Sequence, residues 1–185
     1  MRRIFIVVVK DVEEFRKYLP IFSRCVSSAL MISHGLRRDT SLIFFFLNEK
    51  IGVKILGLYL KQVRPDEQSL RGIMRKIIRF VVLRKDKKRL HAGIFASRGE
   101  LYNFLKIGSK PYTLVEARDG TDIREIKFNG YNTIVYVVSL NTPLDAVLKN
   151  LGKRIKFQRV RVSRQALFPD NLIVLMNNEL DRRFL

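Results

Sequence analysis

The chain has 185 residues and a mass of 21.7 kDa, a size that suits one domain, so we expect a single domain over residues 1–185. Its one cysteine, Cys25, excludes an internal disulfide and a multi-thiol metal site, and its two histidines are too few for a zinc cluster, so no metal is expected. The longest apolar runs have six residues, far below the roughly 18 that cross a bilayer, and no signal-peptide pattern follows Met1. We therefore expect a cytoplasmic protein without a membrane partner.

Positive charge is the outlying feature of the composition. Lysine and arginine number 36 against 17 aspartates and glutamates, which gives a formal net charge of +19. Such an excess repels itself in a compact chain and suits an anionic partner. Nucleic acid is the first candidate, because lysines and arginines release counterions when they neutralise phosphates. A membrane surface and a solvated basic exterior are the alternatives.

Two basic clusters carry much of this charge. The first includes one acid, Asp86, and the second includes none. Both can be solvent-facing sides of a helix and an edge strand in a heat-adapted protein. A solvated face usually mixes both signs, however, and arginine suits phosphate, so contact with an RNA or DNA backbone is favoured. The clusters comprise Arg75, Lys76, Arg79, Arg84, Lys85, Lys87, Lys88 and Arg89, and then Lys153, Arg154, Lys156, Arg159, Arg161 and Arg164.

The first half of the chain alternates strand and helix patterns. Residues 3–9 form an apolar, β-branched run that predicts a strand buried on both faces. A stripe of small and apolar residues from Phe22 to Ser33 then predicts a helix, and strands are expected over 41–47 and 50–58. Asp66 begins the longest amphipathic pattern, which continues through Val82. Residues 84–89 are expected to form a charged loop.

The second half repeats shorter units of the same kind. Asp119 and Gly120 suggest a turn, after which residues 123–128 can pair back as a strand. Strands alternating with helices indicate an α/β domain with a mostly parallel sheet. The remaining strands are expected over 91–97, 111–116, 133–138 and 153–162, and the remaining helices over 100–106, 142–150 and 169–182.

One segment carries a resemblance to a known family. Residues 24–39 read RCVSSALMISHGLRRD, and residues 61–67 read KQVRPDE. Both resemble the archaeal TrmY family, tRNA pseudouridine N1-methyltransferases of the SPOUT superfamily. The similarity continues more weakly through residues 91–94 and the pair Leu180 and Asp181, so that it covers nearly the whole chain.

The resemblance implies a fold and a reaction. It implies a SPOUT-type α/β domain with a C-terminal trefoil knot, and a homodimer with its active site at the subunit interface. S-adenosylmethionine (SAM) is the implied methyl donor, and N1 of pseudouridine 54 in the T loop of tRNA is the implied acceptor. Two alternatives remain: an RNA-binding relative that has lost its donor pocket, and a relative that methylates ribosomal RNA.

The family motif also implies the residues that act on RNA. N1 of pseudouridine carries a proton, so we expect Asp39 to orient or accept it, with Arg37 as a second catalytic residue. The less specific interpretation is that Asp39 pairs with a neighbouring arginine, that Asp66 is only a helix N-cap, and that Cys25 fills the core. The residues expected to bind RNA are Arg38, Arg64, Arg75, Arg79, Lys87, Lys88 and Arg89.

The donor site is expected where two late strands end. In the family a Gly-Asp-His-x-Gly turn lets the backbone approach the adenosyl group, whereas residues 138–143 read VSLNTP and contain no glycine. Contacts from strand ends do not depend on particular side chains, so SAM is still expected to bind. The residues expected to line its site are Val138, Ser139, Leu140, Val162, Ser163, Leu167 and Asn171.

Overall fold

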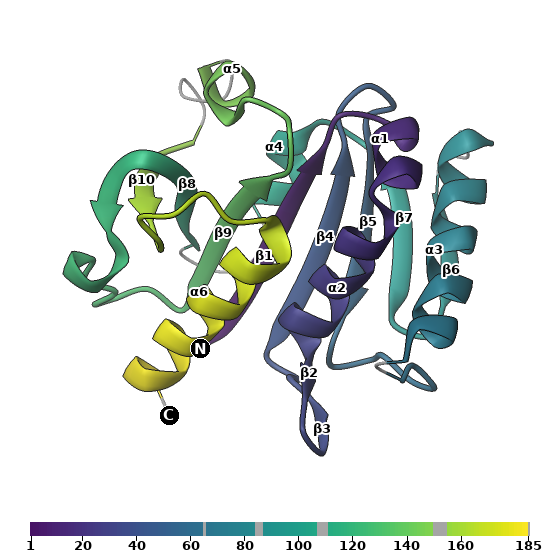
Figure 1. The fold of residues 1–185 in the computed structure, drawn as a ribbon, viewed down its shortest axis with the longest axis horizontal. Helices are drawn as coiled ribbons and strands as arrows, with labels where there is room; N and C mark the ends of the chain where they lie inside the picture. The colour runs from purple at the N-terminus through teal and green to yellow at the C-terminus, as the bar shows by residue number, and fades with distance from the viewer. Residues whose placement is uncertain (65, 84–86, 107–110, 150–154, 185) are drawn as a thin grey trace.

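A computed structural model describes the chain apart from residues 65, 84–86, 107–110, 150–154 and 185. Its centre is an eight-stranded sheet with the order β10-β8-β9-β1-β4-β5-β7-β6 (Figure 1). The strands of this sheet are β1 (Arg2–Val9), β4 (Thr40–Phe46), β5 (Ile51–Leu56), β6 (Lys87–His91), β7 (Ile94–Arg98), β8 (Pro111–Asp122), β9 (Thr133–Ser139) and β10 (Phe157–Arg161). The helices are α1 (Val12–Lys17), α2 (Leu19–Leu30), α3 (Glu67–Val82), α4 (Leu101–Leu105), α5 (Leu144–Lys149) and α6 (Pro169–Phe184).

The sheet has a parallel half and an antiparallel half. The neighbours β10, β8, β9, β1 and β4 pair in parallel, whereas β4, β5, β7 and β6 pair antiparallel. Four of the seven pairings are thus parallel, which confirms the predicted α/β class. The trefoil knot stays a prediction from the family resemblance.

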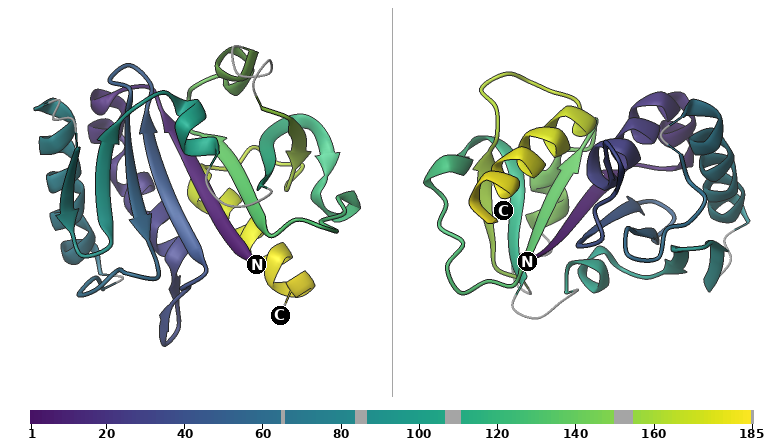
Figure 2. Two further views of the ribbon diagram at one scale, coloured as in Figure 1. Left: turned by 180° about the vertical axis from the view of Figure 1, so that it is seen from behind. Right: turned by 90° about the horizontal axis from the view of Figure 1, so that it is seen from below.

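Helices cover both faces of the sheet. Helices α1, α2, α3 and α6 lie on one face, and α4 and α5 lie on the other (Figures 1 and 2). Successive residues of β1 serve the two faces alternately: Phe5 and Val7 pack with the larger helical layer, while Ile4 and Ile6 pack with the smaller. A strand covered on both faces must be apolar at every position, which explains the continuous run near the N-terminus.

Local signals set two helix boundaries. The N-cap of α3 is Asp66, whose Oδ1 accepts a hydrogen bond of 2.7 Å from the Ser69 N–H, as expected. Helix α2 ends at Leu30, three residues before the predicted end, because the following residues form a small hairpin of β2 (Met31–Ile32) and β3 (Gly35–Leu36). His34 therefore lies in an exposed turn. Cys25 is fully buried on α2, which confirms its role in the core.

Three other predictions were wrong. Asp119 and Gly120 do not form a hairpin turn, because β8 continues to Asp122. Residues 123–125 then form a short 3-10 helix instead of a returning strand. Part of the expected charged loop is the edge strand β6, whose lysines discourage pairing with another sheet.

Among the described residues, no helix is long and apolar enough to span a membrane.

Candidate active site

The first candidate site surrounds Asp39 at the start of β4. Arg3 is only 3% exposed, and its Nε lies 3.2 Å from Asp39 Oδ2. Thr40 adds a hydrogen bond of 2.9 Å from its hydroxyl to Asp39 Oδ1. The side chain of Asp39 itself remains 42% exposed. Arg3 and Thr40 therefore hold the carboxylate in place, while part of it remains open to solvent.

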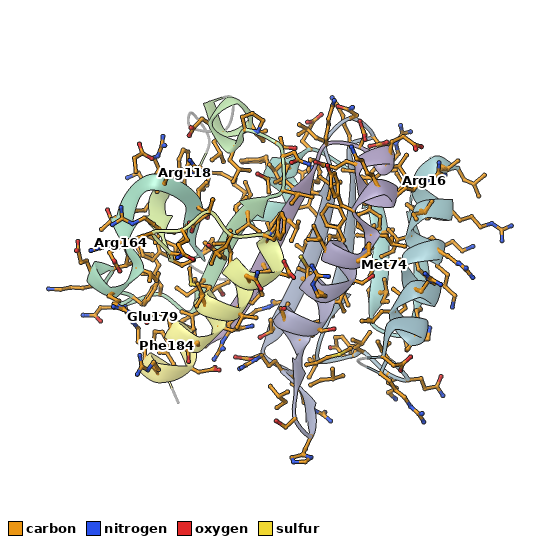
Figure 3. All side chains as sticks on the ribbon, viewed as in Figure 1. Arg16, Met74, Arg118, Arg164, Glu179 and Phe184 are labelled. Carbon is orange, nitrogen blue, oxygen red and sulfur yellow. The ribbon has the colours of Figure 1, made fainter. Side chains whose placement is uncertain are left out.

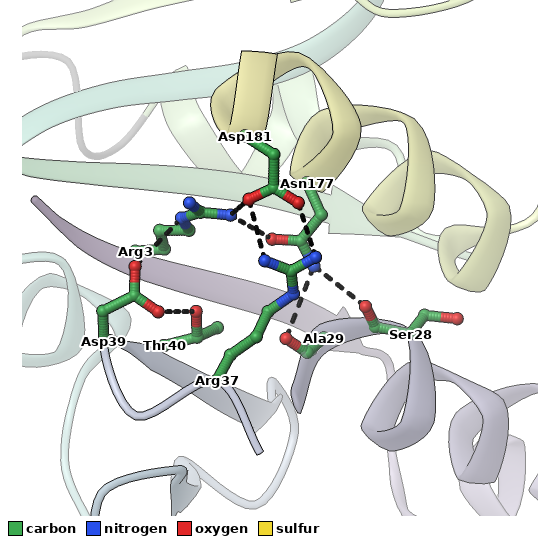
Figure 4. Close-up of polar contacts among 8 residues, drawn as sticks. All are labelled: Arg3, Ser28, Ala29, Arg37, Asp39, Thr40, Asn177 and Asp181. Carbon is green, nitrogen blue, oxygen red and sulfur yellow. Dashed lines mark hydrogen bonds and ion pairs between the residues drawn. The ribbon is translucent and has the colours of Figure 1, made fainter. Parts of the chain in front are cut away.

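Helix α6 holds the other charges of this site. Arg37 donates two hydrogen bonds to Asp181, of 2.8 and 2.6 Å, and Arg3 Nη1 lies 2.5 Å from Asp181 Oδ1 (Figure 4). Asn177 accepts from Arg3 at 3.2 Å and donates to the Ser28 carbonyl at 2.9 Å, which ties α6 to α2. We call Arg3, Arg37, Asp39, Asn177 and Asp181 the Asp39 cluster.

The charges of the Asp39 cluster balance one another. Burial acts to raise the pKa of Asp181, but hydrogen bonds from Arg37 and Arg3 outweigh it and lower that pKa below its ordinary value. The carboxylate of Asp181 is thus ionised, and together with Asp39 it balances the charges of the two guanidinium groups. The predicted catalytic residue Arg37 is 18% exposed, and its guanidinium group is paired with Asp181. Arg37 therefore positions Asp181 of α6.

A small cavity lies beside Asp39. It has a volume of about 320 Å³ and is lined by Arg2, Arg38, Asp39, Ser41, Leu56, Leu58 and Tyr59. Tyr59 is 58% exposed, so an aromatic face is available next to the carboxylate. The structure brings Arg38 and Asp39 together here, as the family motif implied. Arg64 is exposed and does not line this cavity.

A larger cavity lies at the opposite edge of the sheet, where β9 and β10 end. We call it the strand-end pocket, and its volume is about 500 Å³. Open α/β sheets bind ligands at the carboxyl ends of their parallel strands, and a volume of this size suits a nucleoside-sized molecule. Its lining includes four of the predicted donor-binding residues: Ser139, Leu140, Ser163 and Leu167.

The other three predicted donor-binding residues do not line the pocket. Val138 is fully buried in the core, and Val162 is partly buried against it. Asn171 is exposed on the first turn of α6. Alternation along β9 explains Val138, because its neighbour Ser139 lines the pocket. Val162 follows the end of β10 and directly precedes Ser163, which lines the pocket.

A bulge in β8 builds one wall of the pocket. Arg159 of β10 pairs with Val115, but the next residue, Val160, pairs with Thr121, so that residues 116–120 leave the ladder. Gly120 permits this, because a Cβ at that position would lie 2.5 Å from the Val160 carbonyl carbon. Bulges of this kind often redirect side chains beside functional sites. The residues that it turns toward the pocket are Glu116, Ala117, Arg118 and Asp119.

The glycine-free turn after β9 leaves the pocket open. Ser139 closes the turn with a hydrogen bond of 2.5 Å from its hydroxyl to the Thr142 carbonyl. Leu140 and Pro143 line the cavity without filling it. The Thr142 hydroxyl is buried there and has no hydrogen-bond partner among the described residues. A buried polar group without a partner favours a ligand that can supply one, so the wall fits the hydroxyl and amino groups of a nucleoside.

Glu116 is a functional candidate that the sequence did not reveal. Its Oε2 accepts a hydrogen bond of 2.6 Å from the hydroxyl of Tyr136, a fully buried residue of β9. Burial raises the pKa of Glu116 to about 7, although Tyr136, the Val162 backbone and Arg161 act to lower it. No motif marks this residue, and only the bulge places it at the pocket.

The first basic cluster forms a groove between α3 and β6. The groove has a volume of about 330 Å³, and Lys76, Arg79 and Lys88 surround its apolar floor of Phe80 and Leu90. None of these three cations has an ion-pair partner within the described part of the chain. Basic side chains project from α3 along this flank (Figure 3).

The other predicted RNA-binding residues lie nearby. Arg75 is exposed on α3, and Arg89 is exposed on β6; the side chain of Lys87 lies outside the described residues. The second basic cluster differs, because Arg159 pairs with Asp119 at 2.5 Å and with Asp145 at 3.0 Å. Acids that are distant in sequence thus compensate part of a cluster that lacks acids of its own.

The two candidate sites lie a strand length apart within one chain. Arg3 pairs with Thr40 on one side and with Ile134 on the other. Ser139 lies five residues further along β9, which at about 3.3 Å per residue is about 17 Å. Asp39 therefore does not face the strand-end pocket of its own chain.

Comparisons with known proteins agree with this fold. Residues 10–184 match the family described as "Putative SAM-dependent RNA methyltransferase". The chain belongs to this family, whose members use SAM as methyl donor.

Curated archaeal relatives carry a more specific name. A protein of Methanosarcina acetivorans is 32% identical over 171 residues, covering 89% of this chain and 78% of its own. A protein of Methanocella arvoryzae is 28% identical over 170 residues, covering 89% and 85%. Both are named tRNA (pseudouridine(54)-N(1))-methyltransferase. A crystal structure of Archaeoglobus fulgidus Nep1 bound to S-adenosylhomocysteine (SAH) shares the fold, with a TM-score of 0.65 at 11% identity and 98% coverage of each chain.

Proposed function

We propose that this protein transfers a methyl group from SAM to N1 of pseudouridine 54 in the T loop of tRNA. The observation that carries the proposal is the strand-end pocket, which opens at the strand ends and is lined by four of the seven expected donor-binding residues. The names of the archaeal relatives supply the substrate, and the net charge of +19 suits an RNA partner.

The pocket supplies position and exclusion of water. When bound, SAM provides an electrophilic methyl group on a sulfonium. Leu140, Leu144 and Leu167 give apolar walls, while the Thr142 hydroxyl offers a polar contact. Positioning of this kind is the main requirement of an in-line methyl transfer.

The Asp39 cavity receives the target base. Asp39 accepts the hydrogen bond of the N1–H group, because Arg3 and Thr40 hold its carboxylate in one orientation. Tyr59 offers a face on which an unstacked base can lie, and Arg38 offers a cation for the flanking phosphate. Arg37 acts indirectly by fixing Asp181.

Two copies of the chain are needed to complete the site. Helix α6 runs against the direction of β9: Leu172, in its first turn, lines the strand-end pocket, and Asp181, near its end, belongs to the Asp39 cluster. If two α6 helices pack antiparallel about a two-fold axis, the Asp39 cluster of one copy lies beside the pocket of the other. The helix is about 24 Å long, enough to span the separation of the two sites.

The outer face of α6 supports this arrangement. Val174 and Leu175 are 48% and 36% exposed on the helix, and Phe168, just before it, is 54% exposed. Exposed apolar residues grouped on one element are typical of an interface. A Val174→Glu and Leu175→Glu double variant should therefore sediment as a monomer and lose methyl transfer, with the monomer's fold unchanged by circular dichroism.

The groove between α3 and β6 extends the RNA-binding surface. Lys76, Arg79 and Lys88 can contact phosphates, since no acid among the described residues neutralises them. Replacing Arg79 with Gln should reduce the slope of log affinity against log salt by about 0.7–0.9, the value of one phosphate contact.

The decisive experiment measures methyl transfer to a synthetic tRNA T arm. Labelled SAM should methylate an arm with pseudouridine at position 54 and leave an arm with uridine there unmodified. Asp39→Ala should reduce the rate at least about 100-fold, the lower end of the range for loss of a proton acceptor. Transfer only to ribosomal RNA fragments would reassign the substrate, and no transfer to either RNA would contradict the enzymatic proposal.

Mixing two inactive variants tests the shared site. Asp39→Ala removes the base site, and Ser163→Trp fills the donor pocket, so neither homodimer can act. A mixed dimer retains one intact pocket facing one intact Asp39, and random mixing should restore about a quarter of the activity. Failure to restore any activity in a proven mixed dimer would place both sites within one chain.

A further inference from the structure

Resting on the proposed function, we propose that Glu116 is the specificity residue of the strand-end pocket, where its carboxylate favours the cationic methyl donor over the neutral product. SAM and SAH differ by one methyl group and by the positive charge on sulfur. An enzyme must bind the first and release the second, so a group that responds to this charge helps turnover.

Position makes Glu116 the acid best suited to this role. It lines the pocket from the β8 bulge, and the Tyr136 hydroxyl holds its Oε2 at 2.6 Å. Tyr136 is fully buried, so the donor comes from the interior of the sheet and fixes the carboxyl from behind. A carboxyl group held in this way points a fixed negative charge at whatever occupies the cavity.

The other charges of the pocket are already compensated or exposed. Asp119 and Asp145 share the guanidinium of Arg159, at 2.5 and 3.0 Å, and both acids are 71% exposed. Arg118 is exposed at the rim of the same wall. Glu116 has no ion pair within the described part of the chain, and Arg161, a cation that acts to lower the pKa of Glu116, is the weakest of the influences on that pKa.

Proton binding makes the proposal measurable. The pKa of Glu116 is about 7, raised mainly by burial, so without ligand the group is largely protonated at pH 6 and ionised at pH 8. A sulfonium in the pocket favours the ionised form, and binding should therefore release a proton near neutral pH. A neutral thioether exerts no such pull.

Calorimetric titration of the whole protein with SAM and with SAH tests this at pH 6 and pH 8. The affinity for SAM should fall about tenfold from pH 8 to pH 6, matching the change in the ionised fraction, while that for SAH changes less than about twofold. Near pH 7, SAM binding should also release part of a proton, measured in two buffers of different ionisation enthalpy.

Three variants separate recognition from structural effects. Glu116→Gln should weaken SAM binding about tenfold at pH 8, abolish its pH dependence and leave SAH binding unchanged. Tyr136→Phe removes a hydrogen bond that lowers the pKa, so the loss of SAM affinity should begin at higher pH. Glu100→Gln, which removes an exposed acid outside the pocket, should behave as the unmodified protein.

The possible failures are distinguishable. An equal pH dependence for SAM and SAH would mean that Glu116 senses the amino group that both ligands carry, and it would overturn the proposal. So would an unchanged preference for SAM in Glu116→Gln. If neither ligand binds at either pH, the pocket is not the donor site, and the proposed function falls as well.

Discussion

The two ends of the parallel strands differ in how their polar groups are paired. At the start of β1 and β4, the charged residues of the Asp39 cluster form ion pairs with one another. Arg3 is 3% exposed and lies against two carboxylates. At the far end of β9 and β10, the chain leaves a cavity of about 500 Å³, an orphaned hydroxyl on Thr142 and an acid, Glu116, whose ionised form is disfavoured.

This difference reflects what each end has to do. The Asp39 cluster must hold one carboxylate in one orientation, so its charges are paired with one another, although Arg3 Nε and Arg37 Nε have no hydrogen-bond partner among the described residues. Under the proposed function, the strand-end pocket admits a charged molecule and releases a neutral one, and the Thr142 hydroxyl there has no partner among the described residues. Stability should therefore depend mainly on the first end, and ligand response on the second.

The largest effect on stability is expected from Asp181→Ala. Removal of this carboxylate leaves Arg3 buried and Arg37 half-buried without their shared counter-charge, and loss of one partner of a buried pair costs about 3–5 kcal/mol. Urea denaturation measures the change. Glu179→Ala, which removes the i,i+4 partner of Arg183 on the same helix, should cost about 1 kcal/mol. Equal losses in the two variants would contradict the special role of the cluster.

The same carboxylate predicts a dependence on acid. Because the pKa of Asp181 is lowered in the folded protein, its stabilising contribution is present above its ordinary pKa of 3.8 and is lost as the pH falls below that value. Asp181→Asn should flatten this part of the stability curve, measured by thermal unfolding between pH 2.5 and pH 5. A curve that keeps its full slope in the variant would refute the assignment.

An intermediate effect is expected at the bulge. Gly120→Ala places a Cβ against the backbone of Val160, which cannot move aside as a flexible side chain can, and should cost about 1–3 kcal/mol. It should also weaken SAM binding by distorting the pocket wall. Gly72→Ala is the matched control: no atom lies within 4 Å of its Cβ on α3, so the variant should gain about 0.5–1 kcal/mol from helix propensity.

Glu116 gives a pH dependence of opposite sign to that of Asp181. Its pKa is about 7 in the folded chain against an ordinary value of 4.5, so the folded state holds the proton more tightly. Its contribution therefore makes the ligand-free protein less stable as the pH rises from about 4.5 to 7. Glu116→Gln should remove this decline in thermal scans, and saturating SAH should leave it in place. An identical decline in the variant would show that other groups cause it.

The smallest effect is expected at the rim of the pocket. Asp119→Asn removes one partner of Arg159, but the pair is largely exposed and Asp145 still neutralises the guanidinium. Exposed pairs contribute about 0–1 kcal/mol, and salt screens them. Urea denaturation at low and high salt should detect little change; a loss above about 2 kcal/mol would show that the rim is structurally more important than its exposure suggests.

Local patterns predicted much of the fold and part of the site. The apolar run of β1, the N-cap at Asp66 and the stripe of α3 depend on neighbours in sequence, so they could be recognised without coordinates. Two of the residues predicted to bind the donor, Ser139 and Ser163, line the strand-end pocket, and their role there stays a prediction. The errors arose where a contact distant in sequence explains a residue that a local pattern assigned differently. Gly120 was assigned to a turn, but a glycine is needed there because the Val160 backbone lies too close for a Cβ.

The sequence by itself determined the class of the protein, its basic surface and the segment that ends at Asp39, because composition, period and motif are properties of consecutive residues. Only the tertiary structure decided that Arg3 meets Asp181 across 178 positions and that Glu116 enters a pocket with Tyr136 behind it. It also placed the two functional ends about 17 Å apart along the sheet. Such contacts depend on strand order and register. These are set by the packing of many residues together, so no short segment of the sequence reveals them.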